Sequence, residues 1–387
     1  MSKPMLQGWR EVGLLEVALI KARLVDPRKP ELNDMILIAP DHIQSGVGRI
    51  GEKATAREQG AISGKFYVKK NSVIYSKIRP YLMKAAIADE EVLCSADMYP
   101  FECTGDITST YLLNVLLSKR FTDFAISCSS RTGIPKINRE EISGFRFFLP
   151  PISDQINISS VAFLWDAAIE KTEQLITAKL RAKDSYAIFL LAAKHPDFKR
   201  ADELFTPVSE KGRDDLQILS VTQDQGVIPR SMLDKQILME ASSVSSFKVV
   251  REGDFVISLR SFQGGLEYSP YKGVVSPAYT VLRPREDVCP EFFRHYLKSK
   301  DFLQRLSVAV IGIRDGKQIN FSDFASIKLP VPPRDAQVQY AEFFDAMECE
   351  VVLLKRQKDS LQKQKRGLMQ KLLTGQWRMA KPVSKEL

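Results

Sequence analysis

Two stretches of the sequence gather side chains that could bind the edges of nucleic-acid bases. Reading a base edge needs forked donors and amides, with aromatic or methyl-contacting groups beside them. Each half of the chain carries such a set in a region of loop-like composition: Lys77, Arg79, Tyr81 and Lys84 in the first half, and Arg260, Ser261, Gln263, Tyr268 and Lys272 in the second. An ordinary solvated surface contains the same residue types, so both interpretations stay open.

A second pair of segments could bind phosphate. RTGIPKIN (131–138) and RDGKQIN (314–320) each combine an arginine, a glycine turn, a lysine and an asparagine. Glycine lets backbone N–H groups approach a phosphate, and the cations supply counter-charge. The candidate residues are Arg131, Lys136, Asn138, Arg314, Lys317 and Asn320. A simple turn that closes each domain is an equally good explanation.

The composition is that of a soluble globular protein with a basic excess. The 387 residues include 56 Lys and Arg against 47 Asp and Glu, which gives a net charge of +9 and favours a polyanionic partner. No apolar run approaches the ~20 residues that span a bilayer, and the N-terminus lacks a secretory h-region, so we expect a cytoplasmic protein. The five cysteines form no C-x-x-C pair, which argues against a zinc site, and we expect no metal.

The residues needed for catalysis are not found in a recognisable pattern. The only histidines, His42, His195 and His295, are better explained as surface or hydrogen-bonded core residues than as bases. The segment 97–101 has a single proline where an adenine methyltransferase needs a proline pair. Residues 60–66 are one residue short of a phosphate loop and have Phe66 in place of the Mg²⁺-binding hydroxyl. We therefore predict a chain that is not itself an enzyme.

The two halves of the sequence repeat each other. Ile137-Asn138 recurs as Ile319-Asn320, and Gln155 recurs as Gln337, both at an offset of 182 residues. Each half begins with short strand-like runs punctuated by glycine and proline, passes through LPPISDQ or VPPRDAQ, and ends in about 38 residues without proline. A period of this length indicates a duplicated domain, each followed by a long helix.

Both predicted helices share one heptad frame. The apolar positions of this frame predict a seam along which the helices pack as a coiled coil. The seam residues are Ile158, Trp165, Ile169, Ile176, Tyr340, Phe344, Met347, Val351, Leu354, Leu361, Leu368 and Leu372. Alternatively, each helix only covers its own domain. The second helix also carries a basic run, residues 355–371, which would suit DNA, an acidic partner or plain solvent.

In these features the chain resembles the specificity (S) subunit of type I restriction-modification enzymes. The resemblance rests on the two proline-pair segments, on QKQKRGLMQKLLTGQW (362–377), and on ILSVTQDQGVIPR (218–230) and YKGVVSPAYTVLRP (271–284). It implies a mixed α/β (α+β) fold with two similar target recognition domains, separated by two long antiparallel helices and related by a pseudo-two-fold axis. The expected boundaries are 1–152 and 196–334 for the recognition domains, 153–195 and 335–376 for the helices, and 377–387 for a tail.

The resemblance also implies a function. Each recognition domain would read one half of an asymmetric, bipartite site on double-stranded DNA, and the helices would set the gap. Two methyltransferase subunits, which carry S-adenosylmethionine, would dock on the helices, and motor-nuclease subunits using ATP and Mg would complete a bacterial or archaeal restriction system. No cofactor is expected in this chain. Two alternatives are a methyltransferase-only system and a coiled-coil protein adaptor without a DNA role.

Overall fold

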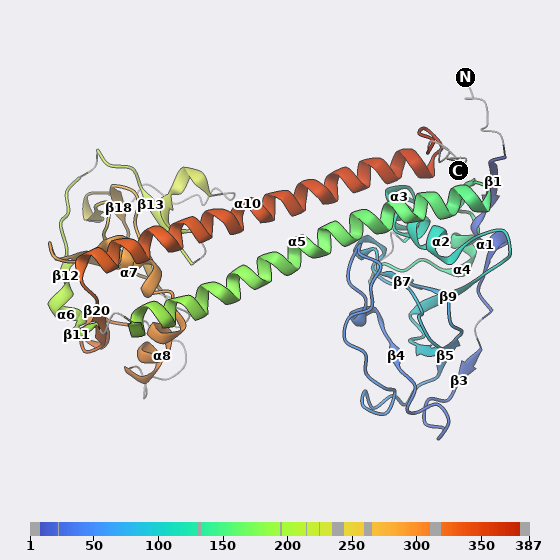
Figure 1. The fold of residues 1–387 in the computed structure, drawn as a ribbon, viewed down its shortest axis with the longest axis horizontal. Coiled ribbons are helices and arrows are strands. Elements are labelled where there is room, and N and C mark those ends of the chain that lie inside the picture. The colour runs from blue at the N-terminus through green and yellow to red at the C-terminus, as the bar shows by residue number, and fades with distance from the viewer. Residues whose placement is uncertain are drawn as a thin grey trace, which may run out of the picture. The chain divides into compact units, whose positions relative to one another are not determined.

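The computed structural model describes residues 8–21, 23–129, 133–193, 196–213, 215–223, 225–233, 244–258, 265–309 and 319–379. They form two compact units, one of residues 1–173 with 356–387 and one of residues 174–355. Each unit contains one domain of helices and short strands and a length of two long helices, α5 (Ile152–Ala193) and α10 (Arg334–Leu373) (Figure 1). The predicted mixed fold with long helices is confirmed. Within the described ranges, no helix has the length and apolar character needed to cross a membrane.

The described residues of the first domain form three small sheets and four short helices. Strands β1 (Arg10–Gly13) and β10 (Arg146–Leu149) pair with each other, and the two four-stranded sheets have the orders β2-β9-β6-β7 and β3-β5-β8-β4. The bounds of the strands in these two sheets are β2 Ala18–Leu19, β3 Leu24–Val25, β4 Leu37–Ile38, β5 Lys65–Val68, β6 Val73–Ser76, β7 Ala85–Ile87, β8 Val92–Cys94 and β9 Met98–Cys103. The helices are α1 Leu14–Val17, α2 Ser109–Leu116, α3 Lys119–Cys128 and α4 Arg139–Ser143.

The second domain repeats this order of elements. Strands β11 (Asp197–Arg200) and β20 (Lys328–Val331) pair with each other, and one four-stranded sheet has the order β12-β19-β16-β17. The remaining strands are β12 Phe205–Val208, β13 Leu219–Thr222, β14 Gly226–Pro229, β15 Lys248–Val250, β16 Phe255–Ile257, β17 Leu266–Tyr268, β18 Gly273–Val275 and β19 Thr280–Pro284. The helices are α6 Ala201–Leu204, α7 Pro290–Tyr296, α8 Lys300–Ala309 and α9 Phe321–Ala325.

The two domains share one four-stranded sheet and three helices, and they differ in how their remaining strands pair. Sheets β2-β9-β6-β7 and β12-β19-β16-β17 are equivalent, as are the helix pairs α2 and α7, α3 and α8, and α4 and α9. The first domain has a further four-stranded sheet with a parallel β4–β8 pair, whereas the second has two separate pairs, β13-β14 and β15-β18. The duplication predicted from the sequence is therefore a duplicated fold.

A buried glutamine in the first turn of each long helix explains one of the repeated motifs. The Gln155 amide accepts a hydrogen bond from the Thr108 backbone N–H (2.8 Å) and donates to the carbonyls of Asp106 (2.8 Å) and Pro150 (2.9 Å). Gln337 accepts from the Cys289 N–H (3.1 Å) and donates to the Pro332 carbonyl (2.9 Å). Each glutamine thus ties the start of its long helix to the residue that precedes α2 or α7.

Within each unit α5 and α10 run antiparallel. In the first unit Lys365 pairs with Asp166 (2.5 Å) and Lys358 with Glu173 (2.9 Å). In the second unit Lys183 pairs with Glu348 (2.6 Å) and Lys179 with Glu350 (2.9 Å). Since the residue numbers fall in one helix as they rise in the other, the pairs define an antiparallel register. All four lysines lie at seam positions of the predicted heptad frame, where lysine stands in place of an apolar residue.

The predicted seam residues are all buried or partly buried. The buried members are Ile158, Ile176, Tyr340, Phe344, Val351 and Leu372, and the partly buried ones are Trp165, Ile169, Met347, Leu354, Leu361 and Leu368. Some of them also complete the domain cores. Ile158 and Leu372 belong to the main core of the first domain, whereas Tyr340 and Phe344 belong to that of the second.

Replacement of Gln155 tests its role as an anchor. Gln155→Ala removes three hydrogen bonds from a fully buried site, so we expect the free energy of unfolding to fall by about 3 kcal/mol. Urea denaturation followed by circular dichroism measures this loss. The matched control is Gln370→Ala on the exposed face of α10, for which we expect a change within about 0.5 kcal/mol. Equal effects of the two substitutions would refute the anchor.

Candidate nucleic-acid interface

Two of the predicted candidate sets meet in the first domain. The loop between β6 and β7 contains Lys77 and Arg79, and it pairs with the segment before α4. Ile78 and Lys136 form an antiparallel bridge, the Arg79 N–H donates to the Pro135 carbonyl (2.7 Å), and the Ile137 N–H donates to the Lys77 carbonyl (3.0 Å). Candidates separated by more than 50 residues in the sequence therefore lie on adjacent strands of backbone.

A third loop, within residues 39–50, supports the other side of the β6–β7 loop. The Gly46 N–H donates to the Met83 carbonyl (3.0 Å), and the Ser45 hydroxyl donates to the Leu82 carbonyl. The Lys84 ammonium donates to the Pro40 carbonyl (2.6 Å). Lys84 is thus engaged in joining two loops, unlike the exposed Arg79 and Lys136.

The surface formed by these loops is electropositive. Burial lowers the pKa of Lys77, and the nearby charge of Lys136 lowers this pKa further. The Lys77 ammonium also lies 5.3 Å from the centre of the Tyr99 ring. Within the described residues, neither lysine nor Arg79 forms an ion pair. The nearby charge of Asp97 acts on the pKa of Lys77 in the opposite direction. Cations without an ion-pair partner at neighbouring positions favour binding of a phosphate.

The repeated asparagines have a structural role in both domains. The Asn138 side chain accepts a hydrogen bond from the Glu141 N–H (2.8 Å), while the Glu141 carboxylate accepts from the Asn138 N–H (2.7 Å). Asn320 and Asp323 form the same capping box at the start of α9. Each asparagine therefore stabilises a short helix, and contact with DNA remains a prediction for both.

In the second domain the described candidates do not form an equivalent surface. Lys272 is exposed, and its carbonyl accepts a hydrogen bond from Gln217. Tyr268 is partly buried with its ring 5.5 Å from that of Phe255, and burial raises the pKa of its hydroxyl. The other predicted candidates lie outside the described residues: Arg131 in the first domain, and Arg260, Ser261, Gln263, Arg314 and Lys317 in the second.

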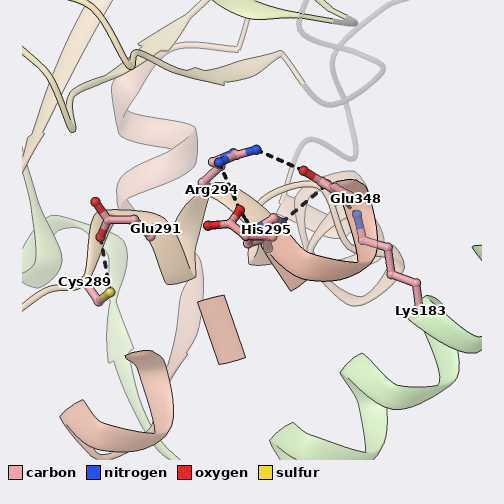
Figure 2. Close-up of polar contacts among 7 residues, drawn as sticks. Lys183, Cys289, Glu291, Arg294, His295 and Glu348 are labelled. Carbon is pink, nitrogen blue, oxygen red and sulfur yellow. Dashed lines mark hydrogen bonds and ion pairs between the residues drawn. The ribbon is translucent and has the colours of Figure 1, made fainter. Parts of the chain in front are cut away.

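Sequence reasoning did not find a polar cluster between α7 and the long helices of the second unit. The imidazole of His295, almost fully buried, lies 2.8 Å from the Asp345 carboxylate and 3.5 Å from that of Glu348. Arg294 bridges the same two carboxylates at 3.1 and 2.9 Å (Figure 2). Lys183 reaches Glu348 from α5. A cavity of about 710 Å³ is lined by Lys183, Arg294, His295 and Glu348 of this cluster, and also by Tyr268 and Lys298.

The cluster is better explained as an ionic joint than as a metal site. The ligand atoms of His295, Asp345 and Glu348 lie within 4.8 Å of one another, a spacing that a metal ion could use. However, Arg294 and Lys183 already provide positive charge to these carboxylates. Burial alone would raise the pKa of Glu348, but hydrogen bonds from His295 and Lys183 lower it to about 2. The spacing of Asp345 and Glu348 on one helical face was the available sequence signal, but it does not identify α7 as the partner.

A family model covers most of the chain. The model described as "Type I restriction modification DNA specificity domain" matches residues 7–179 and 219–363. The type I restriction enzyme EcoDI specificity subunit of Escherichia coli is 37% identical over 151 residues, which are 39% of this chain and 33% of that protein. The putative type I restriction enzyme MjaX specificity subunit of Methanocaldococcus jannaschii is 23% identical over 63% of this chain and 62% of its own length. The matches thus span one third and about three fifths of these two relatives.

Solved structures share the fold at low sequence identity. A chain from a structure titled for the complex assembly and conformational transition of the type I R-M system superposes with a TM-score of 0.61. It is 19% identical, and the match covers 97% of this chain and all of that chain. The S subunit of a type I restriction-modification system from M. genitalium superposes with a TM-score of 0.53 at 14% identity, over 98% of this chain and 99% of that chain.

Acid titration tests the ionic joint. The pKa of Glu348 is about 2 in the folded protein and lies near its ordinary, higher value in the unfolded protein. The ionised Glu348 carboxylate therefore contributes its full share of the free energy of unfolding at pH values above the unfolded pKa, and this share is lost as the pH falls towards the folded pKa. We expect Glu348→Gln to destabilise the protein at pH 7 and the difference from the unsubstituted protein to shrink between about pH 4.5 and pH 2. Urea denaturation at a series of pH values measures it. Glu342→Gln, at an exposed position of α10, is the control, and a pH-independent difference for Glu348→Gln would contradict the assignment.

Proposed function

The chain belongs to the family of type I restriction modification DNA specificity domains, and we propose that it is the sequence-reading subunit of such a system. In this proposal each domain reads one half of a bipartite site on double-stranded DNA. The chain itself is not catalytic, because base modification and cleavage are carried out by partner subunits. The matched residues of the family model fall in both halves of the chain, which supports two reading domains.

The observation that carries the proposal is the electropositive surface of the first domain. Lys77, Arg79 and Lys136 lie on two paired loop segments, and they have no ion-pair partner among the described residues. Other cations of the first domain, such as Lys53 and Arg57, are paired with carboxylates. Unpaired cations on a rigid loop surface suit phosphates, which position a protein on DNA.

The recognised site should be asymmetric. Both domains contain a two-stranded pair, β1-β10 or β11-β20, and an equivalent four-stranded sheet. They differ in the remaining strands, which form one four-stranded sheet in the first domain and two separate pairs in the second. Two unlike reading surfaces on a common frame predict two unlike half-motifs separated by a fixed gap.

The long helices supply the surface for partner subunits in this proposal. Ile156, Phe163 and Leu164 lie on α5 in the first unit and are 52%, 70% and 66% exposed. Val352 and Leu353 of α10 are also exposed in the second unit. Such apolar exposure favours protein docking. We assign these faces, together with the partly buried seam, to two methyltransferase subunits that bind S-adenosylmethionine. ATP and Mg would be used by motor-nuclease subunits in the cytoplasm.

Mapping of adenine methylation tests the function directly. We expect co-expression of the chain with the methyltransferase subunit of its system to yield one bipartite, asymmetric methylated motif across the host genome. Deletion of this chain should abolish methylation at that motif, because the methyltransferase then lacks the subunit that recognises the DNA sequence. Methylation that is unchanged by the deletion would indicate a protein adaptor instead.

The salt dependence of DNA binding tests the lysine pair. Each phosphate contact contributes about 0.9 to the slope of log K against log salt concentration. We expect the double substitution Lys77→Gln and Lys136→Gln to reduce this slope by about 1.8 in the assembled complex, without changing the methylated motif. Fluorescence anisotropy with duplex DNA at several salt concentrations measures the slope. The control is Lys53→Gln, since Lys53 is already paired with Asp89 and Glu90, and an equal effect there would refute the specific role of the pair.

A further inference from the structure

Tyr81 is an exposed aromatic side chain at the tip of a short turn. It lies in a 3-10 turn, Pro80–Leu82, between β6 and β7, and it is 53% exposed. No hydrogen bond or ring contact of its side chain exists among the described residues. Neighbouring aromatic residues behave differently: Tyr75 and Tyr99 are buried and pack against Phe121 and Phe101. The position of Tyr81 is therefore not explained by packing of the first domain.

The backbone on both sides of Tyr81 is strained. Arg79 has φ 49° and Met83 has φ 50°, so both lie in the left-handed region that side-chain-bearing residues avoid. Asn71 is the other described non-glycine residue with positive φ, and asparagine tolerates this region. Two such residues bracket a turn that starts with Pro80, whose ring fixes its own φ. Strained backbone is retained where the surroundings impose it, and it is common at binding sites.

Contacts from two other loops hold the turn in this conformation. Pro135 accepts a hydrogen bond from the Arg79 N–H (2.7 Å), and the Met83 carbonyl accepts one from the Gly46 N–H (3.0 Å). Within the turn, the N–H groups of Leu82 and Met83 donate to the carbonyls of Arg79 and Pro80, both at 2.9 Å. The Lys84 side chain adds a further link to Pro40. The turn thus presents the Tyr81 ring on a backbone that is fixed before any ligand binds.

We infer that the Tyr81 ring contacts a base of the first half-site, while Lys77 and Lys136 beside it contact phosphate. This inference rests on the proposed DNA-reading function and names the residue that contributes sequence discrimination. The hydroxyl of a tyrosine can donate to a phosphate, but its ring finds apolar contact only at base edges and the thymine methyl in a groove, and Tyr81→Phe separates the two contributions. A rigid aromatic group also loses little conformational entropy on binding, because it has only two side-chain torsions and its turn is already ordered.

The four residues that the sequence predicted to read bases in this loop make different contacts in the structure. Lys84 is bonded to a backbone carbonyl of the supporting loop, and Lys77 is partly buried over the Tyr99 ring. Arg79 is exposed, but its backbone serves to pair the loop with Pro135. Tyr81 is 53% exposed, and its side chain makes no hydrogen bond or ring contact among the described residues. It is therefore the residue that can enter a groove without breaking the loop.

Substitution of Tyr81 in the complete complex separates base contact from phosphate contact. We expect Tyr81→Ala to relax the methylated motif at one position of one half-site, and to reduce discrimination there by about tenfold, while the salt slope of binding stays unchanged. Tyr81→Phe keeps the ring and should keep the motif. Methylation mapping gives the motif, and anisotropy with duplexes that differ at single positions gives the ratio of dissociation constants.

Two controls make the outcomes distinct. Ile62→Ala removes an apolar side chain that is 76% exposed in the same domain but lies outside the three loops, and it should leave the motif intact. Thermal denaturation checks that each variant is folded. If Tyr81→Ala retains full discrimination at every position, or if it weakens all sequences equally with a lower salt slope, the inference is wrong. A wild-type complex that methylates no bipartite motif would instead overturn the proposed function itself.

Discussion

The architecture depends on one buried side chain that is used twice, the glutamine in the first turn of each long helix. Gln155 joins the helix start to the residues before α2 through two hydrogen bonds, to Thr108 and Asp106, and Gln337 makes one corresponding bond, to Cys289 before α7. Each glutamine also donates to the proline carbonyl just before its own helix. Both glutamines are almost completely buried, so a polar atom left without a hydrogen bond at either position would lower the free energy of unfolding substantially. The orientation of each domain on its own helix, and hence that of its loops, follows from this link.

The two domains are attached to their helices by different forces. In the first unit Ile158 and Ala162 of α5 and Met369, Leu372 and Leu373 of α10 enter the main core of the domain. In the second unit Tyr340 and Phe344 enter the core, and the ionic joint around Glu348 adds polar contacts from α7 and α5. Apolar packing contains no group that titrates and no charge that salt can screen. Partly exposed ion pairs weaken when the pH falls through the pKa of the carboxylate and when the salt concentration rises. The first attachment also contains an ion pair, between Arg49 and Glu170 of α5 (2.7 Å), so solution conditions affect both attachments, and they affect the second more because it contains the larger ionic cluster.

The sequence was sufficient to predict the duplicated fold, the long helices and their shared frame. These features repeat at a fixed offset or a fixed period, and such patterns are visible without coordinates. The site was less predictable. The pairing of Ile78 with Lys136 and the engagement of Lys84 by Pro40 depend on loop geometry. The joint at Glu348 depends on which helix packs against α10, a tertiary choice that local spacing does not determine. For Lys179, Lys183, Lys358 and Lys365, the frame placed the residues on the seam, but only the structure identified their acidic partners.

Repetition and divergence within the chain separate framework from reading surface. The residues that recur at the same offset, Gln155 with Gln337 and Asn138 with Asn320, are committed to bonds that hold the fold. A side chain that already bonds within the fold has fewer donors and acceptors left for a ligand. Tyr81, by contrast, makes no such bond in the described structure. If two copies of one fold are to read different bases, discrimination must come from positions that the fold itself does not require, and a loop tip whose side chain makes no internal bond meets that condition.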